Sequence, residues 1–542
     1  MDKHISSPFL RDIPTTAADW RYIAFERHKH EVFPIWKRAP ESSDDYSGKS
    51  ASGSGSAEFN DDDEDSDGGK KSGFAKYWPI VTTGAGLFSD GYINNSISTV
   101  STCLSIIYGK EYSESRALRN ISSIVFAGTV AGQLIFGYLA DHFSRKSAML
   151  LGTSMLILFT ILCSGAWGKG TSGTHAGGLF TALTVYRFFL GIAIGSEYSS
   201  SSPAAAEASN LLPRGKRNRY FIWFTNSMID FGFVAGAFVP LVLLWICGSH
   251  HLTPVWRLTI GLGAIPPCSL FILRLYYREG KKFRESRFNK NVPVWRIIKF
   301  YWFRVFIISA IWFLYDFSAY AFGTYSSIII GMVLPKDAPL YKNFGWNVVF
   351  NLFYMPGTIV GAVVSDYLGP RLTISIGLVV QSAIGFALAG ALDHLKKHIV
   401  GFVFIYGVFI TLGEFSAGNN IGVIASKMNA TPVRGTLYGI AAMIGKVGAF
   451  VGTYVFPSLI KNHGLSAPYY VASALCIFSA MLAFFLLPDL DQDAMKREDD
   501  KFIEYLISTG YDVSSMGMKD DSPESDVSSV SITNVDEKGF AK

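Results

Sequence analysis

The chain has 542 residues, of which 49% are hydrophobic and only 17% are charged, and its mean hydropathy is positive. This composition excludes an ordinary soluble enzyme and indicates a membrane protein. The formal net charge of +5 is small and combines an acidic N-terminal region with basic loops. Such a balance gives no indication of nucleic-acid binding.

Residues 1–73 contain no long apolar run and include the stretch SSDDYSGKSASGSGSAEFNDDDEDSDGG. A segment this polar cannot bury a core, so we expect 1–73 to form a disordered cytoplasmic tail. No basic start followed by a short apolar stretch is visible, so the first hydrophobic helix is expected to direct membrane insertion.

Twelve apolar segments follow, each about long enough for a helix that crosses a bilayer. A basic connector at 278–300 separates them into two groups of six, and a cytoplasmic tail at 489–542 ends the chain. We therefore expect an all-α membrane protein with twelve transmembrane helices, in an N-terminal half at 74–277 and a C-terminal half at 301–488. The segments lie near residues 77–100, 120–140, 147–167, 179–203, 219–247, 256–277, 301–333, 346–367, 372–393, 399–426, 435–460 and 467–488.

Basic residues concentrate in the loops after the second, fourth and sixth segments. Arg145 and Lys146 follow the second segment, Arg214 to Arg219 follow the fourth, and Arg278 to Arg296 follow the sixth. These loops share one side of the membrane, and the positive-inside rule predicts that this side and both tails are cytoplasmic. Lysines at 396 and 397 lie on the opposite side, so the bias is not absolute.

The two halves of the chain echo each other. Gly132, Asp141 and Lys146 recur 225 residues later as Gly357, Asp366 and Arg371. The fifth and eleventh segments both carry paired small residues, Gly232 with Gly236 and Gly448 with Gly452. Such correspondence is typical of a parallel repeat of two six-helix halves, with a substrate cavity between them near the midplane.

Several ionisable residues fall inside the expected spans, where a charge costs about 2.5 to 3.5 kcal/mol unless it is solvated or paired. They are Asp90, Glu197, Asp230, Asp316, Glu414 and Lys446. Burial disfavours the charged form of a carboxylate, so such acids can take up a proton, as a proton-coupled symporter requires.

Trp312, Asp316 and Tyr320 are spaced by four residues and so lie on one helical face. Lys446, alone in the eleventh segment, is the expected counter-ion for an anionic ligand such as phosphate. A structural ion pair between Asp316 and Lys446 is the alternative, and it does not exclude a ligand that exchanges into the pair. For Asp230 and Glu414, a position nearer a water-filled mouth stays open as an alternative to a place in the cavity.

The stretch GYLADHFSRK, residues 137–146, resembles the signature loop between helices two and three of the major facilitator superfamily. The stretch SDYLGPR, residues 365–371, is a weaker echo of it. The resemblance implies a fold of two six-helix halves. It also implies that Asp141, Arg145 and Lys146, together with Asp366 and Arg371, brace the halves in one of the alternating states.

Five further stretches resemble the phosphate:proton symporter branch and, more closely, its fungal glycerophosphodiester transporters. They are FSDGYINNS, GSEYSSSS, WFLYDFSAY, YGIAAMIGKVGAFVG and FIEYLISTGYDVSSMG, and the resemblance spans about residues 77–517. It implies a proton-coupled plasma-membrane importer of glycerophosphocholine or glycerophosphoinositol that works by alternating access. The expected partners are an organophosphate anion, protons and the lipid bilayer, with no cofactor beyond the proton gradient and no partner subunit, so that the protein is a monomer.

The same resemblance implies roles for individual residues. Asp90 and Glu197 would couple protons. Independently of the resemblance, the intramembrane acids Asp230 and Glu414 are candidate contacts for the headgroup, and if the headgroup is choline, Glu414 or Glu197 together with aromatic faces would hold the ammonium. The residues implied to bind substrate are Tyr198, Trp312, Asp316, Tyr320, Asn419 and Lys446.

Three positions depart from the family pattern. Ser199 stands where a proline is common, Glu197 where the phosphate branch has an aspartate, and Lys427 where relatives usually carry a glutamate. The first two fit a pocket reshaped for something other than inorganic phosphate. The alternatives are an inorganic phosphate:proton symporter and a nutrient-sensing receptor with a transporter fold. An enzyme is not expected, because the sequence contains no nucleophile and base pair, metal cluster or phosphate-cradling glycine loop.

Overall fold

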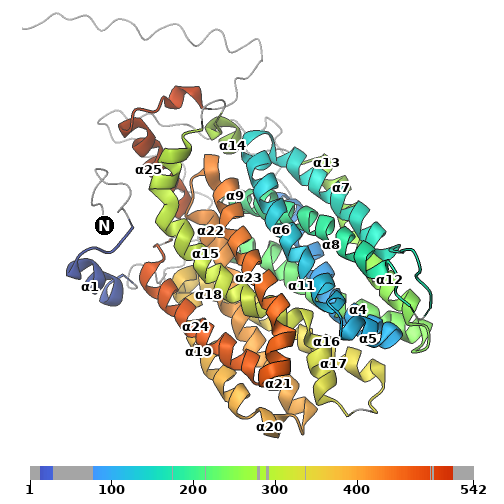
Figure 1. The fold of residues 1–542 in the computed structure, drawn as a ribbon. Coiled ribbons are helices and arrows are strands. Elements are labelled where there is room, and N and C mark those ends of the chain that lie inside the picture. Colours follow the sequence, from blue (N-terminus) through green and yellow to red (C-terminus); the bar gives the residue numbers. More distant parts are fainter. Residues whose placement is uncertain are drawn as a thin grey trace, which may run out of the picture.

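The computed structural model describes residues 12–27, 77–173, 175–210, 212–213, 215–277, 281–288, 292–335, 337–488, 490 and 493–516. Within these ranges the regular elements are helices, and the one strand-like pairing is an isolated bridge between Phe288 and Met516. Most of the helices run along a common axis (Figure 1). The predicted all-α class is confirmed.

The N-terminal half forms the right-hand side of the bundle in Figure 1, in blue to green. Its fourth, fifth and sixth spans are each built from consecutive helical pieces, and the fourth contains a π-helical turn, η2. The elements are α3 (Trp78–Gly84), α4 (Leu87–Tyr108), α5 (Lys110–Ser113), α6 (Ala117–His142), α7 (Arg145–Ser164), α8 (Leu179–Ser196), η2 (Glu197–Ser201), α9 (Ser202–Asn210), α10 (Arg217–Phe224), α11 (Asn226–Cys247), α12 (Leu252–Leu262) and α13 (Ile265–Leu275).

The C-terminal half also contains a π-helical turn, η3, in its fourth span, but its sixth span is the single helix α24. It occupies the left-hand side in Figure 1, in yellow to red. The elements are α15 (Val294–Thr324), α16 (Ser326–Val333), α17 (Leu340–Leu352), α18 (Tyr354–Leu368), α19 (Pro370–Gly390), α20 (Leu392–Leu395), α21 (Ile399–Gly413), η3 (Glu414–Gly418), α22 (Asn419–Lys427), η4 (Thr431–Val433), α23 (Arg434–His463) and α24 (Ala467–Leu486).

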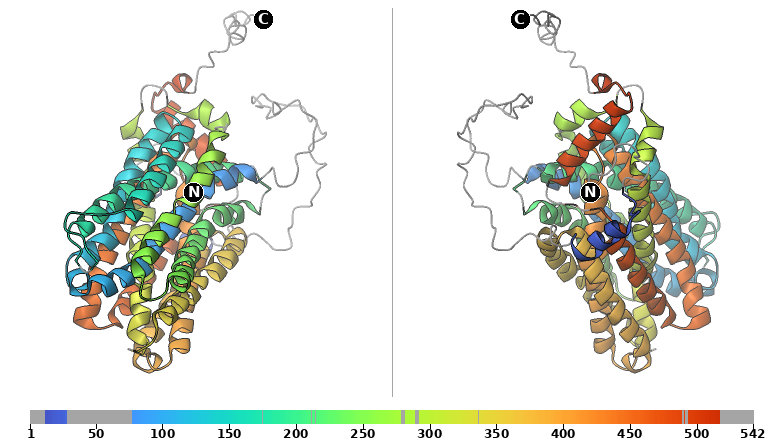
Figure 2. Two further views of the ribbon diagram at one scale, coloured as in Figure 1. Left: turned by 90° about the vertical axis from the view of Figure 1, so that its right-hand side faces the viewer. Right: turned by 90° about the vertical axis from the view of Figure 1, so that its left-hand side faces the viewer.

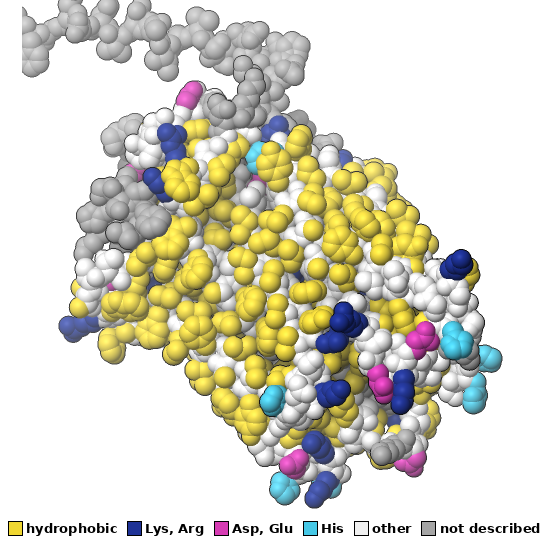
Figure 3. Space-filling view, viewed as in Figure 1, with side chains coloured by type: hydrophobic (Ala, Val, Ile, Leu, Met, Phe, Trp, Pro, Cys, Tyr) yellow, Lys and Arg dark blue, Asp and Glu magenta, His cyan; other side chains and the backbone are white. Residues whose placement is uncertain are grey.

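Eleven helical segments among the described residues are long and apolar enough to cross a membrane. The one remaining predicted segment, the first along the chain, is α3 with α4. The 22-residue helix α4 is less hydrophobic than the other spans because it buries polar side chains, among them Asn94 and Asn95. Large apolar side chains cover the flank of the bundle between its ends (Figure 3). The structure thus has the twelve predicted segments and an apolar outer surface suited to lipid.

The predicted internal repeat is confirmed by how the glycines pack. Gly232 of α11 leaves room for the backbone of α4. A side chain at Gly232 would clash with the carbonyl oxygen of Phe88 in α4. Gly448 of α23 meets the Phe313 carbonyl of α15 in the same way. The fifth helix of each half therefore packs closely against the first through the same small residues.

The predicted tail at 1–73 includes an ordered segment, which corrects that expectation for residues 12–27. Helix α1 (Ala17–Phe25) begins with a capping box in which Thr16 and Asp19 satisfy each other's backbone N–H groups. The Nε and Nη2 atoms of the buried Arg304 in α15 donate to Asp12 at 2.6 and 2.8 Å. A buried guanidinium needs carboxylate partners, and this need explains why part of the tail is held in place. The rest of the predicted tail lies outside the described residues.

The connector also ends earlier than predicted, because α15 begins at Val294 rather than near residue 301. The connector contains α14 (Lys281–Ser286), and the C-terminal tail contains α25 (Ala494–Ser508) followed by η5 (Val513–Ser515). Helices α14 and α25 lie at the same end of the bundle (Figures 1 and 2). We call this the connector end. Arg214 and residues 278–280 of the predicted basic loops lie outside the described residues.

Candidate substrate and proton site

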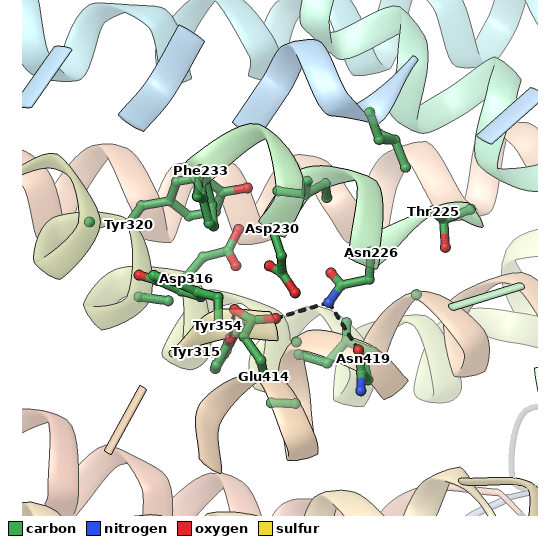
Figure 4. A pocket seen from close by; sticks show the side chains of 18 of the residues that line it. Thr225, Asn226, Asp230, Phe233, Tyr315, Asp316, Tyr320, Tyr354, Glu414 and Asn419 are labelled. Atoms are coloured by element: carbon green, nitrogen blue, oxygen red, sulfur yellow. Dashed lines mark hydrogen bonds between the residues drawn. The ribbon is translucent and has the colours of Figure 1, made fainter. Parts of the chain in front are cut away.

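A cavity lies between the two halves and holds about 70 Å³ of open space, room for roughly five waters. Helices from both halves supply its wall. All eight residues predicted to contact substrate or headgroup line it, namely Tyr198, Asp230, Trp312, Asp316, Tyr320, Glu414, Asn419 and Lys446. Figure 4 shows several of these side chains pointing into the same space.

Lys446 lies at the centre of a network on the C-terminal half. Its Nζ is 3.2 Å from Asp316 Oδ2 and donates to the Tyr320 hydroxyl. The ammonium also lies 3.7 Å from the ring centroid of Tyr320 and 4.7 Å from that of Tyr198. The ion pair raised as an alternative is therefore present. It lies in the cavity wall, where an anion can compete with Asp316 for the lysine.

Asp90 of α4 lies behind the two tyrosines and is almost completely buried. The Tyr320 hydroxyl donates to its Oδ2 at 3.1 Å, and the Tyr198 hydroxyl and the Asn94 amide also donate to its carboxylate. Asp90 and Tyr198 belong to the N-terminal half, whereas Tyr320 belongs to the C-terminal half. A continuous chain of hydrogen bonds therefore joins Asp90 to Lys446 across the interface between the halves.

Glu414 and Asp230 lie on another part of the wall (Figure 4). Glu414 accepts hydrogen bonds from Asn226 and from the Tyr315 hydroxyl, each at 2.9 Å. Asn419 accepts from Asn226 at 3.0 Å and donates to the carbonyl of Thr358 at 3.0 Å. These contacts place the predicted headgroup residues in the cavity rather than at a water-filled mouth.

Glu197 does not line the cavity, which corrects its expected placement. Its carboxylate accepts two hydrogen bonds from Arg274, from Nη1 to Oε1 at 2.5 Å and from Nη2 to Oε2 at 2.6 Å. The Ser201 hydroxyl also donates to Oε2, at 2.8 Å. Both side chains of the ion pair are 1% exposed. Arg274 lies in α13, near the end of the sixth predicted segment, and was not among the predicted site residues.

At the connector end, the two predicted gating aspartates make equivalent contacts between the halves. Asp141 at the end of α6 accepts from the backbone N–H of Gly435, 3.1 Å away at the start of α23. Asp366 at the end of α18 accepts from the backbone N–H of Asn218, 3.1 Å away at the start of α10. Each aspartate thus binds the N-terminus of the fifth span in the opposite half, where the helix dipole favours an anion.

The basic gating residues are more varied. Arg145 and Arg434 both pair with Glu207, so this glutamate joins the two halves. Lys146 donates to the Leu275 carbonyl at 2.7 Å and Arg371 to the Phe484 carbonyl, and each of these contacts stays within one half. The sequence indicated the gate but not the central position of Glu207 and Arg434.

The halves also touch at the opposite end of the cavity. Asn95 donates to Asn351 at 2.9 Å, and the Ser98 and Ser326 hydroxyls lie 3.1 Å apart. Contacts between the halves therefore stand on both sides of the cavity along the bundle axis. Any opening of the cavity toward one end requires the contacts between the halves at that end to separate.

Comparisons with known proteins agree with this arrangement. The profile of the family described as "Sugar (and other) transporter" matches residues 78–291 and 281–497. The chain is 55% identical to the glycerophosphocholine permease GIT4 of Candida albicans, over 81% of this chain and 84% of that protein. It is 52% identical to the major glycerophosphoinositol permease GIT3 of the same species, again over 81% of this chain and 84% of that protein.

Among solved structures, the proton:xylose symporter XylE bound to 6-bromo-6-deoxy-D-glucose matches with a TM-score of 0.66 at 15% identity, covering 79% of this chain and 98% of that chain. This likeness shows the fold alone. The family profile covers both halves, and the relatives above are named permeases rather than enzymes. The protein is therefore a multi-pass membrane transporter that belongs to the sugar (and other) transporter family and has the major facilitator fold.

Proposed function

We propose that this protein is a proton-coupled importer of glycerophosphodiesters that works by alternating access in the plasma membrane, with both termini in the cytoplasm. The observation that carries the proposal is the hydrogen-bonded chain from Asp90 through Tyr320 to Lys446, which links the two halves beside the cavity. Support also comes from the relatives named as glycerophosphocholine and glycerophosphoinositol permeases.

Lys446 is the proposed contact for the phosphate group. A phosphodiester carries one negative charge at neutral pH, and it competes with the Asp316 carboxylate for the ammonium. The hydroxyls of Tyr320 and Tyr198 and the indole of Trp312 line the same part of the cavity and can donate to phosphate oxygens. Asn419 completes the proposed set through its amide.

Asp90 is the proposed proton carrier. As a carboxylate it accepts hydrogen bonds from Tyr198 and Tyr320, but a protonated carboxyl group accepts fewer. Proton uptake by Asp90 therefore releases the hydroxyl of Tyr320 toward the cavity, where the phosphate binds beside Lys446. In this scheme loading of the proton favours loading of the anion, as symport requires. Glu197 does not carry a proton in this scheme, because its carboxylate forms a buried ion pair with Arg274.

The proposal is tested by uptake of labelled glycerophosphocholine, glycerophosphoinositol and orthophosphate into cells that lack their own diester uptake, at two external pH values. We expect uptake of the diesters to rise with external acidity and to fall at least about a hundredfold in Lys446→Met, because an anion then enters an acidic cavity without its counter-ion. Lys461→Met is the matched control, since Lys461 is exposed near the end of the same helix.

Competition separates the rival function. If orthophosphate in modest excess abolishes diester uptake and is itself carried, the protein is a phosphate symporter instead. Because Asp316 loses its partner in Lys446→Met, the variant Lys446→Arg is included. It keeps the positive charge and should retain part of the uptake, whereas equal loss in both lysine variants at normal surface abundance contradicts a role for the charge in binding the anion.

A further inference from the structure

Two carboxylates on the cavity wall form no ion pair with the basic residue that lines the cavity. The charged lining residues are Asp230, Asp316, Glu414 and Lys446. Lys446 contacts Asp316, which leaves Asp230 and Glu414 as a pair of acids. Electrostatic repulsion between them is part of their environment, so the cavity favours a positive charge at this place.

Asp230 is the less satisfied member of the pair. Its residue is 0% exposed, and within the described part of the chain neither of its carboxylate oxygens has a donor in hydrogen-bonding geometry. The Thr358 hydroxyl interacts with Asp230 but donates its proton to Asn419 Oδ1 at 2.8 Å. A buried carboxylate without a donor is unfavourable, and its oxygens point into the cavity (Figure 4). This geometry is suited to a ligand that brings positive charge.

Aromatic rings surround the same place. Phe233, Tyr315 and Tyr354 line the cavity with Asp230 and Glu414. The rings of Phe233 and Tyr354 pack with centroids 4.9 Å apart and planes inclined by 58°, so they form a continuous aromatic surface. Aromatic faces attract organic ammonium groups, most strongly where water is excluded.

We propose that Asp230 and Glu414, with these three aromatic rings, form a subsite for the cationic headgroup of a zwitterionic glycerophosphodiester, either a quaternary ammonium or a primary ammonium. The inference rests on the proposed function, because it assigns the phosphate end of the same substrate to Lys446. A zwitterion matches a cavity that carries one lysine and an uncompensated pair of acids. A neutral polyol headgroup supplies no charge to this pair.

Sequence similarity does not choose between these headgroups. Relatives named for choline and for inositol esters are 55% and 52% identical to this chain, respectively. The charge of the cavity wall is therefore the feature that distinguishes the two substrates. The subsite predicts that the choline ester is preferred.

The test compares uptake of labelled glycerophosphocholine and glycerophosphoinositol in the same cells for Asp230→Asn and Glu414→Gln. We expect the ratio of choline-ester to inositol-ester uptake to fall at least about tenfold in each variant, the size typical of a lost interaction with a charged group. Inositol-ester uptake should persist. The control is Asp393→Asn, which removes the charge of an aspartate whose side chain is 94% exposed, and it should leave the ratio unchanged.

Either of two other outcomes for the uptake ratio overturns the subsite. An equal fall for both esters assigns the acids to proton coupling or to structure, and an unchanged ratio shows that they do not touch the headgroup. If the wild-type protein takes up neither diester, the proposed function fails, and binding is then the test. Glycerophosphocholine should raise the unfolding temperature of the purified wild-type protein more than glycerophosphoinositol does, and Glu414→Gln should abolish that difference. Equal shifts for the two esters contradict the cationic subsite.

Discussion

The two halves of this transporter place a glutamate at the same point of the same element. Glu197 begins the π-helical turn η2 in the fourth span of the N-terminal half, and Glu414 begins η3 in the fourth span of the C-terminal half. Both side chains are buried. Single π-turns inside α-helices frequently occur at functional sites. In both halves, therefore, a buried glutamate is positioned by the same local structure, the start of a π-helical turn in the fourth span.

The partners of the two glutamates differ. Arg274 from the sixth span holds Glu197 through two parallel contacts. Among the described residues, Glu414 accepts hydrogen bonds from the neutral donors Asn226 and Tyr315, and it faces Asp230. One acid is neutralised and removed from the cavity, while the other stays available to a ligand. At this repeated position, an acid that is paired with a basic residue from a neighbouring helix stays out of the cavity lining, whereas the acid without such an ion pair lines the cavity.

The largest expected effect follows from breaking the neutralised site. Arg274→Ala leaves the Glu197 carboxylate buried without its counter-ion, and removal of one partner of a buried ion pair typically costs about 3 to 5 kcal/mol. We expect a strong loss of folded protein and a lower unfolding temperature in detergent. Thermal unfolding followed by size-exclusion chromatography measures both.

The double variant Glu197→Gln with Arg274→Met is the control for this experiment. It removes both charges and keeps the side-chain volumes similar, so stability should largely recover. If transport also persists in the double variant, the ion pair serves structure. Wild-type stability in Arg274→Ala alone would show that Glu197 has another source of positive charge.

A smaller effect on stability is expected at the corresponding acid of the other half. Glu414→Gln can still accept from Tyr315 or Asn226, and it removes one of two facing carboxylates. We expect a change in the free energy of unfolding of less than about 1 kcal/mol, because one of the two hydrogen bonds is retained and the repulsion between the two acids is removed. Glu197→Gln, measured in parallel, should be clearly less stable since Arg274 is left unpaired. Equal destabilisation in the two variants would mean that the charges of Glu197 and Glu414 contribute equally to stability.

Much of the site was predictable because a charge inside a long apolar run is visible in sequence. Asp316, Lys446 and Glu414 stand out in this way, and the four-residue spacing of Trp312, Asp316 and Tyr320 places them on one face. The offset of 225 residues between Asp141 and Asp366 likewise predicted a repeat, and the structure confirms it as two equivalent helix caps. Local patterns of spacing were sufficient for these features.

Pairing between distant helices was not predictable. Glu197 and Arg274 are 77 residues apart, and nothing in either segment shows that η2 and α13 bring them together. The ordered segment at 12–27 was missed for a different reason. Its capping box of Thr16 and Asp19 is a local signal, but the polar character of the surrounding region outweighed it. The anchoring contact with Arg304 depends on the folded bundle.

The smallest expected effect concerns the gate, where the halves again differ. Glu207 joins Arg145 to Arg434 across the interface on the Asp141 side of the gate, while Asp366 pairs with Arg219 at 3.0 Å on the other side. In Glu207→Gln, Arg434 still donates to the carbonyls of Ser426 and Asn429 at 2.9 and 3.1 Å. We expect opening at the connector end to become more frequent by up to about fivefold, because the Glu207 carboxylate is 21% exposed and each buried arginine keeps a second carboxylate nearby, Asp141 at 3.8 Å from Arg145 and Asp499 at 3.9 Å from Arg434.

A cysteine in place of Ser365 reports this opening, because Ser365 is 0% exposed beside α10. The exposed Cys268 is first replaced by serine so that it does not react. Maleimide labelling of Ser365→Cys should be faster in Glu207→Gln than with Glu207 intact. Since the label reports on the Asp366 side of the gate and the substitution lies on the Asp141 side, faster labelling requires the two contacts to open together. An unchanged labelling rate would instead mean that each aspartate cap holds its own side of the gate independently of the other.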